Sequence, residues 1–354
     1  MSLTVLRGCV HGSTAQWLCR ALTSVGLVVA LATQATAAPH AGVHITDNLY
    51  ATRFITPQEG WAVGAFGVIF HTLDGAETWR PQVSHTVEPL FSVDFADPEH
   101  GWICGRSGVI LHTDDGGQHW RLQPSGSPRH LFKVAALDRQ RAWVVGDWGV
   151  ILATHDGGAT WEDHSLARDV ILNGQSWPNS ERGWIVGEAG TILATDNGGR
   201  TWTDQVSGVQ KTLFGVAFRN PQEGWAVGID GLILHTTDAG QTWQVQHGNS
   251  QVGALAQVGF VQALSNPSLY DVAVVGRYGY AVGDAGAVFA SQDGGHTWHR
   301  VKTSGKHRLG WIRSVSLVSG THGLYVGAGG LAVRIAHGRI ASREHKANAA
   351  EAAH

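Results

Sequence analysis

Six glycine-rich turns carry a carboxylate or amide side chain at a fixed spacing from a hydroxyl. Each turn begins with Thr or Ser, and Asp or Asn stands two residues later. Small residues and a Trp follow. The Asp or Asn residues are Asp74, Asp115, Asp156, Asn197, Asp238 and Asp293. Calcium takes about six to eight oxygen ligands, and each turn supplies only one or two carboxylates. Asp and Asn in turns also accept hydrogen bonds from nearby backbone N–H groups. The pattern therefore predicts structural turns.

The turns belong to a repeat that fills most of the chain. Six copies, such as GWICGRSGVILHTDDGGQHW from Gly101 to Trp120, precede a degenerate copy that begins at Gly323. The first four intervals between copies are 41 residues, and the next two are 55 and 44. The second copy contains four short runs, 90–95, 102–105, 109–113 and 119–123, rich in aromatic and β-branched residues and bounded by turn residues. Such runs are typical of β-strands.

A repeat of about 41 residues with four strands is typical of a propeller blade. We predict an all-β fold, a seven-bladed β-propeller of four-stranded antiparallel blades over residues 38–337. Side chains alternate along a strand, so small residues such as Ser92 should face the central channel. The large residues Phe91 and Phe214 should pack between blades, and Tyr50 and Tyr270 are also assigned to the repeat core. Residues 40–46 are expected to add an outer strand to the last blade.

Histidine is abundant, with 20 copies, and could suggest a metal site. His71, His112 and His235 share one repeat position, directly before the hydroxyl of the turn, and alanine occupies it in other copies. Equivalent positions in different blades lie far apart, whereas zinc ligands converge within about 2 Å of one ion. We expect these histidines to pack in the repeat core, and we predict no metal or cofactor.

The N-terminus predicts export. Residues 1–37 contain Arg7 and Arg20 but no acid, then an apolar run over 21–32 that ends in Ala35-Thr36-Ala37. This order is typical of a secretory signal peptide, and the run is shorter than the roughly 20 residues of a membrane span. An uncleaved anchor is the alternative. The predicted location is the periplasm, or the thylakoid lumen in a photosynthetic host.

Composition narrows the remaining possibilities. The net charge of −3 becomes −5 without the first 37 residues, so we predict no nucleic-acid partner. Cys104 is the one cysteine left after cleavage, which excludes an internal disulfide. Neither Cys9 nor Cys19 follows the apolar run, so no lipid anchor is predicted. Residues 338–354 are polar and Ala-rich and are predicted to be a disordered tail.

Candidate binding residues lie in the connections between strands. The connections after the second strands vary between copies, and surface loops on rigid scaffolds commonly carry binding sites. Trp and Arg are frequent interface anchors; the candidates are Arg106, Arg129, Lys133, Trp148, Arg308, Trp311 and Arg313. Alternatively, Trp148 folds over its own blade and the basic residues are solvated loop charges.

The whole repeat resembles that of the photosystem II stability/assembly factor family. The resemblance covers about residues 44–337 and rests on the Leu-Phe-x-Val strand, the turn Asp97-Pro98-x-x-Gly101-Trp102, the GxxG hairpin and the Asp-containing turn, known as an Asp-box or BNR repeat. It implies a non-enzymatic propeller that binds a membrane or envelope protein during assembly. In a photosynthetic host the partner would be a photosystem II subunit, held partly by an arginine-rich patch.

Two other functions fit the sequence less well. Asp-boxes also occur in sialidases, so the alternative is an Asp-box glycosidase. Such an enzyme needs an arginine cluster, a Tyr–Glu pair and an acid on the face opposite the boxes, and no Arg-Ile-Pro stretch occurs near the start of the propeller. The hairpin-tip carboxylates are Asp147, Glu188, Asp230 and Asp284. A small ligand in the channel is the third possibility.

Overall fold

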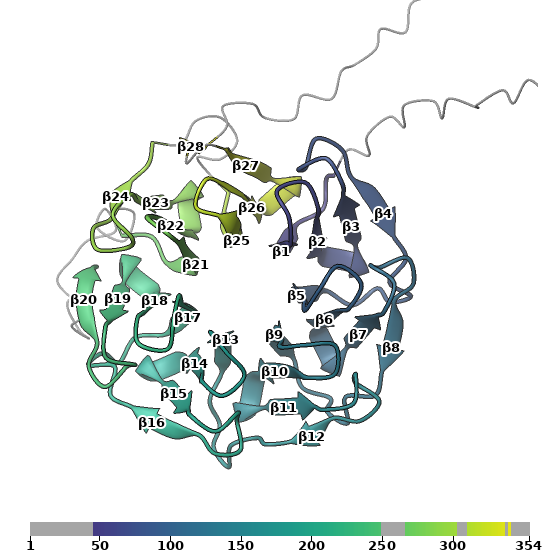
Figure 1. Cartoon of the computed structure of the whole chain (residues 1–354), viewed down its shortest axis with the longest axis horizontal. Coiled ribbons are helices and arrows are strands. Elements are labelled where there is room, and N and C mark those ends of the chain that lie inside the picture. Colours follow the sequence, from purple (N-terminus) through teal and green to yellow (C-terminus); the bar gives the residue numbers. More distant parts are fainter. Residues whose placement is uncertain (1–44, 249–265, 303–309, 337–338, 341–354) are drawn as a thin grey trace, which may run out of the picture. The chain divides into compact units, whose positions relative to one another are not determined.

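Seven four-stranded antiparallel sheets surround a central channel (Figure 1). The computed structural model describes residues 45–248, 266–302, 310–336 and 339–340, all within the compact unit Gly42–His354. In each sheet the strands follow chain order, with the first strand beside the channel and the fourth at the rim. The predicted seven-bladed β-propeller is confirmed. None of the described residues forms a helix with the length and apolarity that a membrane crossing requires.

The four strands of each blade recur with nearly constant bounds. The inner strands are β1 (Leu49–Phe54), β5 (Leu90–Phe95), β9 (Leu131–Ala136), β13 (Leu172–Ser176), β17 (Leu213–Phe218), β21 (Leu269–Val275) and β25 (Ile312–Ser319). The second strands are β2 (Gly60–Gly64), β6 (Gly101–Gly105), β10 (Ala142–Gly146), β14 (Gly183–Gly187), β18 (Gly224–Gly228), β22 (Tyr278–Gly283) and β26 (His322–Gly327). The third strands are β3 (Ile69–Thr72), β7 (Ile110–Thr113), β11 (Ile151–Thr154), β15 (Ile192–Thr195), β19 (Ile233–Thr236), β23 (Val288–Ser291) and β27 (Ala332–Ala336). The outer strands are β4 (Arg80–Gln82), β8 (Arg121–Gln123), β12 (Glu162–Asp163), β16 (Thr203–Gln205), β20 (Gln244–His247), β24 (His299–Arg300) and β28 (Arg339–Ile340).

A short 3₁₀ turn joins the second and third strand of every blade. These turns are η1 (Ala65–Gly67), η2 (Arg106–Gly108), η3 (Asp147–Gly149), η4 (Glu188–Gly190), η5 (Ile229–Gly231), η7 (Asp284–Gly286) and η9 (Ala328–Gly330). In an antiparallel blade the inner strand begins at the end where the second strand finishes. The turns and the starts of the inner strands therefore share one face, here called the tip face, and the Asp-boxes lie on the opposite face.

Apolar packing between neighbouring blades forms the core. In the described part of the chain, one cluster of buried apolar side chains lies at each of the seven blade junctions. At the junction of blades four and five, Trp184 stacks on Phe218 with the ring centroids 3.6 Å apart. At the closing junction, the backbone N–H of Phe54 donates to Ser316 Oγ at 3.0 Å, which joins the first blade to the seventh.

The outer strand described in the last blade comes from the C-terminal side of the chain. It is β28, which pairs with β27 and follows it in the chain. Its residues lie just beyond position 337, where we expected the propeller to end. Of the segment 40–46, only Ile45 and Thr46 are described, and neither belongs to a strand. The predicted N-terminal strand lies mostly outside the described residues, and within them β28 forms the fourth strand of this blade.

The Asp-box turns are held by hydrogen bonds within each turn. In the second blade, Asp115 Oδ1 accepts from Thr113 Oγ1 at 2.8 Å and from the backbone N–H of His119 at 2.9 Å. Thr113 Oγ1 in turn accepts from the backbone N–H of Gly117 at 2.8 Å. Partial burial raises the pKa of Asp115, but the bonds from His119 and Thr113 outweigh it and lower the pKa to about 2. The carboxylate thus satisfies a backbone donor that the turn leaves open.

We expect Asp115→Ala to lower the free energy of unfolding by about 1–2 kcal/mol, since it removes the acceptor for a backbone N–H. The neighbouring Asp114→Ala is the control, because Asp114 pairs with exposed Arg121 and such pairs contribute less than about 1 kcal/mol. The carboxylate stabilises the fold fully above its unfolded pKa of 3.8. That stabilisation is lost as the pH falls through about 2. Urea unfolding at pH 7 and at pH 2.5 measures both effects; equal stabilities of the Asp115 and Asp114 variants at pH 7 would contradict the capping role.

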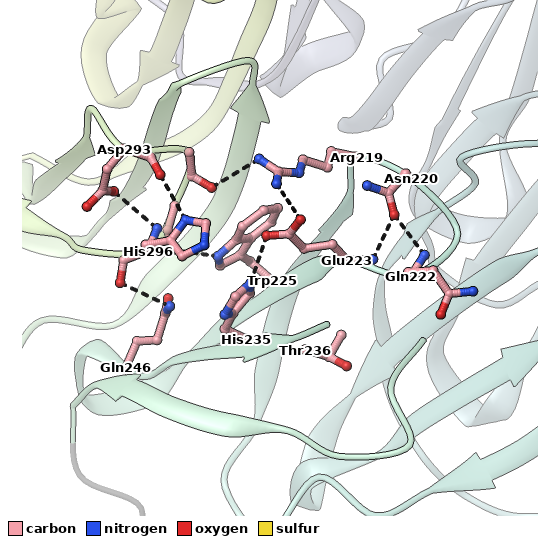
Figure 2. A network of polar contacts seen from close by, with 12 residues as sticks. Arg219, Asn220, Gln222, Glu223, Trp225, His235, Thr236, Gln246, Asp293 and His296 are labelled. Carbon is pink, nitrogen blue, oxygen red and sulfur yellow. Dashed lines mark hydrogen bonds and ion pairs between the residues drawn. The ribbon is translucent and has the colours of Figure 1, made fainter. Parts of the chain in front are cut away.

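Tryptophan and glutamine side chains join several blades to the next Asp-box. Figure 2 shows this junction between blades five and six. The indole N–H of Trp225 donates to the carbonyl oxygen of Gly295 at 2.8 Å, and the Gln246 amide donates to that of His296 at 3.2 Å. Both acceptors lie in the Asp-box turn of blade six. The boxes therefore stabilise contacts between blades as well as their own turns.

The three histidines at the shared repeat position lie in the packed interior. Each ring lies against the Trp of the second strand, with centroids 4.4 Å apart for Trp61–His71, 4.6 Å for Trp102–His112 and 4.9 Å for Trp225–His235. Burial lowers the pKa of His235, although its Nε2 lies 3.2 Å from Glu223 Oε1. This is the core packing that the repeat pattern predicts.

Candidate binding site at the channel mouth

Every inner strand carries a β-bulge at its second residue. In β5, Leu90 is opposite Gly105 and Ser92 is opposite Cys104, which leaves Phe91 outside the register. A bulge inserts one residue into a strand and re-aims its side chain. The seven bulged residues, here called the mouth ring, are Tyr50, Phe91, Phe132, Asn173, Phe214, Tyr270 and Arg313. All seven line one cavity.

A glycine at the end of each second strand makes room for the bulge. A Cβ atom on Gly146 would lie closer than 3.0 Å to the carbonyl oxygen of His130, the residue before β9. That oxygen accepts the backbone N–H of Asp147 at 3.0 Å. The same close approach recurs at Gly64, Gly105, Gly187, Gly228, Gly283 and Gly327. The glycine of the repeat thus has a steric cause, which is the approach of two backbones where the inner strand begins.

Six aromatic side chains, Tyr50, Phe91, Phe132, Phe214, Tyr270 and Trp311, line the cavity. The cavity has a volume of about 340 Å³. On one side, ring centroids are 5.7 Å apart for Phe132–Phe91, 5.8 Å for Phe91–Tyr50 and 5.7 Å for Tyr50–Trp311. On the other side, Phe214 and Tyr270 are 5.2 Å apart. The side chains come from strands of different blades, so the scaffold holds this apolar surface in place.

Two cationic side chains interrupt the aromatic wall. The Arg313 guanidinium lies 4.5 Å from the centroid of Tyr270 and 6.0 Å from that of Phe214. Lys133, from blade three, also lines the cavity. Burial lowers the pKa of the Arg313 guanidinium, and the nearby Tyr270 and Asp271 oppose that shift. Burial and then the hydrogen bond to Asp284 raise the pKa of the Tyr270 hydroxyl to about 12.

The acidic residue of the cavity wall, Asp271, accepts hydrogen bonds from its own blade and from the next blade. Asp271 Oδ2 accepts from Ser314 Oγ at 3.0 Å and from the backbone N–H of Val315 at 2.9 Å. Its Oδ1 accepts from the backbone N–H of Val272 at 3.0 Å. A second channel carboxylate, Asp94, pairs with Arg53 at 2.9 Å. The carboxylates therefore tie inner strands together, and the cavity presents an excess of positive charge.

The bulges overturn one prediction about the channel. Strict alternation placed Phe91 and Phe214 between blades and Tyr50 and Tyr270 in the repeat core, but all four line the cavity. The bulge shifts the side-chain phase by one residue, so the residues after it pack as predicted. Phe95, for example, is buried and stacks on Trp61 with the centroids 3.8 Å apart. The channel mouth is therefore aromatic, although small residues follow the bulge.

The predicted binding residues divide into two groups. Lys133, Trp311 and Arg313 line the cavity. Arg106, Arg129 and Trp148 lie farther out on the tip face, in turns or loops of blades two and three. The remaining candidate, Arg308, falls outside the described residues.

Trp148 is half exposed at its hairpin tip and contacts an arginine. Its side chain is 51 % exposed, and the Arg129 guanidinium lies 4.4 Å from its ring centroid. Arg106 lies 3.9 Å from Glu88. The other basic residue near this group in the sequence, Arg121, pairs with Asp114 at the Asp-box end of its blade. The His130 side chain connects Arg106, Arg129 and Trp148 to the cavity. Its Nδ1 accepts a hydrogen bond from the backbone N–H of Ser107 in η2, and its ring packs edge-on to Phe132.

Three of the four hairpin-tip carboxylates of the glycosidase alternative have partners within the protein. Asp147 accepts the backbone N–H of His130 at 2.9 Å, and Asp230 pairs with Lys211 at 2.5 Å. Asp284 accepts the Tyr270 hydroxyl. These carboxylates therefore help to place loops and mouth-ring residues around the channel.

One group of possible metal ligands occurs among the described residues. Asp97, Glu99 and His100 have ligand atoms within 4.8 Å of one another, on the Asp-box side. Asp97 is engaged by the His100 ring at 2.9 Å and by the Arg139 guanidinium at 2.7 Å. A guanidinium at this distance occupies the carboxylate as an ion pair, and we assign no metal to it.

Known proteins share both the repeat and the fold. Residues 32–127, 127–207, 168–254 and 204–307 match the family model described as photosynthesis system II assembly factor YCF48. Among solved structures, "YCF48 bound to D1 peptide" is 23 % identical with a TM-score of 0.67, over 83 % of this chain and 93 % of that chain. YCF48 from Cyanidioschyzon merolae is 20 % identical with a TM-score of 0.64, over 84 % and 97 %. The WD40 propeller domain of Doa1 is 14 % identical with a TM-score of 0.63, over 85 % and 95 %.

No curated protein matches the chain. The similarities to solved structures show the propeller fold, whereas the family model covers most of the sequence in four overlapping matches. The predicted resemblance is confirmed, and the chain belongs to the photosynthesis system II assembly factor YCF48 family.

Proposed function

We propose that this protein is an exported, non-enzymatic scaffold that binds a segment of a membrane or envelope protein during assembly. In a photosynthetic host, the partner is a photosystem II subunit. Membership of the YCF48 family supports an assembly role, and the structural neighbour described as bound to a D1 peptide supports a peptide ligand. The observation that carries the proposal is the aromatic cavity that the mouth ring forms on the tip face.

The mouth ring has the properties of a protein-binding anchor site. Its residues project from bulged strands of seven blades, so their positions are set before a partner arrives. Preorganised sites lose less conformational entropy on binding. Concave, mainly apolar pockets with a few polar groups are typical ligand sites. The exposed Arg129–Trp148 pair on the same face offers a second contact, since Trp and Arg are frequent interface anchors.

The positions of the carboxylates support binding over glycoside hydrolysis. A glycosidase uses two carboxyl groups about 5–10 Å apart around the scissile bond. Here Asp147, Asp230 and Asp284 come from the tips of different blades, and each is engaged by a neighbouring group. A screen with fluorogenic glycosides tests the alternative. Turnover that disappears in Glu188→Gln would favour the enzyme.

Capture of the native partner tests the proposal. The tagged mature chain is incubated with solubilised native envelope, crosslinked and purified, and the captured proteins are identified by mass spectrometry. The double variant Tyr50→Ala, Phe91→Ala is expected to capture about tenfold less partner, because anchor side chains dominate binding energy. Leu73→Ala is the matched control, since Leu73 is an exposed apolar residue in an Asp-box turn on the opposite face. Equal capture by the double variant and the control would contradict the proposal.

A further inference from the structure

The Arg313 side chain lies at the channel mouth with no ion-pair partner among the described residues. Its guanidinium packs over Tyr270 and Phe214, and the carboxylates of Asp271 and Asp284 interact with it only at longer range. Asp271 has three hydrogen bonds of its own, and Asp284 accepts the Tyr270 hydroxyl. Burying a cation is costly unless a negative group meets it. The cavity therefore offers an anion site that the described part of the chain does not fill.

The cavity walls indicate which groups of the ligand lie beside its negative charge. Aromatic rings from Tyr50, Phe91 and Trp311 cover one side of the cavity, and Phe214 and Tyr270 cover the other. An ammonium or guanidinium group of the ligand would be repelled by Arg313 and Lys133. The volume of about 340 Å³ is at the lower end of ligand pockets, which span about 300–1,000 Å³. It fits a side chain or a chain end, and it is too small for a folded surface.

We propose that Arg313 binds a carboxylate of the partner's peptide segment, while an apolar group beside that carboxylate fills the aromatic part of the cavity. This inference rests on the proposed function and specifies its ligand. A guanidinium forms two parallel hydrogen bonds with a carboxylate, and stacking on Tyr270 leaves its edge free to donate. Asp284 accepts a hydrogen bond from the Tyr270 hydroxyl and so positions the Tyr270 ring beneath the Arg313 guanidinium.

Two small probes of equal shape test the charge requirement. Binding of 3-phenylpropanoate and of its neutral amide, 3-phenylpropanamide, is measured by NMR titration of the mature chain. We expect the carboxylate to bind about tenfold more tightly than the amide, since hydrogen bonds between charged groups are stronger than neutral ones. Arg313→Gln should reduce that ratio to about one, and Arg313→Lys should retain part of it. Arg168→Gln, which removes an exposed arginine from the loop before β13 on the same face, should leave the ratio unchanged.

Peptides distinguish the two sources of the carboxylate. Acetyl-Leu-Glu-Phe-amide carries it on a side chain, acetyl-Leu-Gln-Phe carries it at the chain end, and acetyl-Leu-Gln-Phe-amide is neutral. Tighter binding of either acidic peptide than of the neutral one, dependent on Arg313, supports the proposal and identifies the source. Equal binding of all three peptides, equal binding of the two small probes, or no binding of either probe would overturn it.

Failure of the carboxylate assignment can be distinguished from failure of the proposed function. If Arg313→Gln captures the native partner as well as the unmodified chain, while Tyr50→Ala, Phe91→Ala does not, the peptide-binding role stands and the carboxylate assignment fails. Thermal melting of each variant establishes that the propeller is intact. If Arg313→Gln unfolds, a reduced probe preference in Arg313→Lys relative to Arg168→Gln gives the same comparison in a folded chain.

Discussion

Replacing Trp184 by alanine is expected to lower the free energy of unfolding by about 3–5 kcal/mol. Trp184 is 1 % exposed and stacks on Phe218 of the next blade at 3.6 Å between ring centroids. Its removal leaves a cavity at the junction of blades four and five, where rigid strands on both sides prevent collapse. Urea unfolding followed by circular dichroism measures the change.

The matched control is Trp148→Ala, which removes the same side chain from an exposed tip. Surface substitutions usually change stability by less than about 0.5 kcal/mol, and the contact with Arg129 adds little to the fold. A loss of less than about 1 kcal/mol in Trp184→Ala would contradict the claim that packing between blades holds the ring together.

The substitution Gly146→Ala is expected to cost about 1–3 kcal/mol, because an added Cβ has no room beside the His130 carbonyl oxygen. The same clash acts at the start of β9, so it should also displace the bulged Phe132 from the mouth ring. Thermal melting measures the first effect. Binding of 3-phenylpropanamide, the neutral probe, measures the second.

A second glycine separates crowding from backbone strain. Gly126 has a φ of +71°, but a Cβ there would meet no atom within 4 Å. Gly126→Ala should therefore cost only the strain of a left-handed residue, about 1–2 kcal/mol, and leave probe binding unchanged. If Gly146→Ala binds the neutral probe as well as Gly126→Ala does, the glycine does not support the bulge.

Most of the fold follows from features that recur in every blade. In the second copy the inner strand is predicted at 90–95 and observed as β5 over the same residues. The second strand begins one residue earlier than predicted, and the outer strand begins at Arg121 instead of 119. His119 belongs to the Asp-box, where its N–H donates to Asp115. Local patterns predict the strands well because each blade repeats the same turns.

The binding cavity was harder to predict, since a bulge leaves no clear mark on alternation. Leu90-Phe91-Ser92 reads as a regular strand, and only the pairing with β6 shows that Phe91 is the extra residue. Two signals could have indicated it. One is the glycine that ends every second strand, and the other is the aromatic residue that follows Leu in five inner strands, as in Leu49-Tyr50.

Charge and chain position predicted part of the site. Lys133, Trp311 and Arg313 were selected as exposed interface residues, and the structure brings all three to one cavity. Their convergence depends on ring closure, because Lys133 lies in blade three and Arg313 in blade seven. Residues about 180 positions apart in sequence meet only once the blades close around the axis.

Site-specific crosslinking tests the central claim, that the partner binds at the channel mouth. The photo-crosslinking residue p-benzoylphenylalanine is placed at Phe132 in the mouth ring or at His119, an exposed Asp-box residue on the opposite face. After illumination in native envelope extract, we predict a partner adduct from position 132 and none from position 119. An adduct from position 119 alone would place the partner on the wrong face and contradict the account.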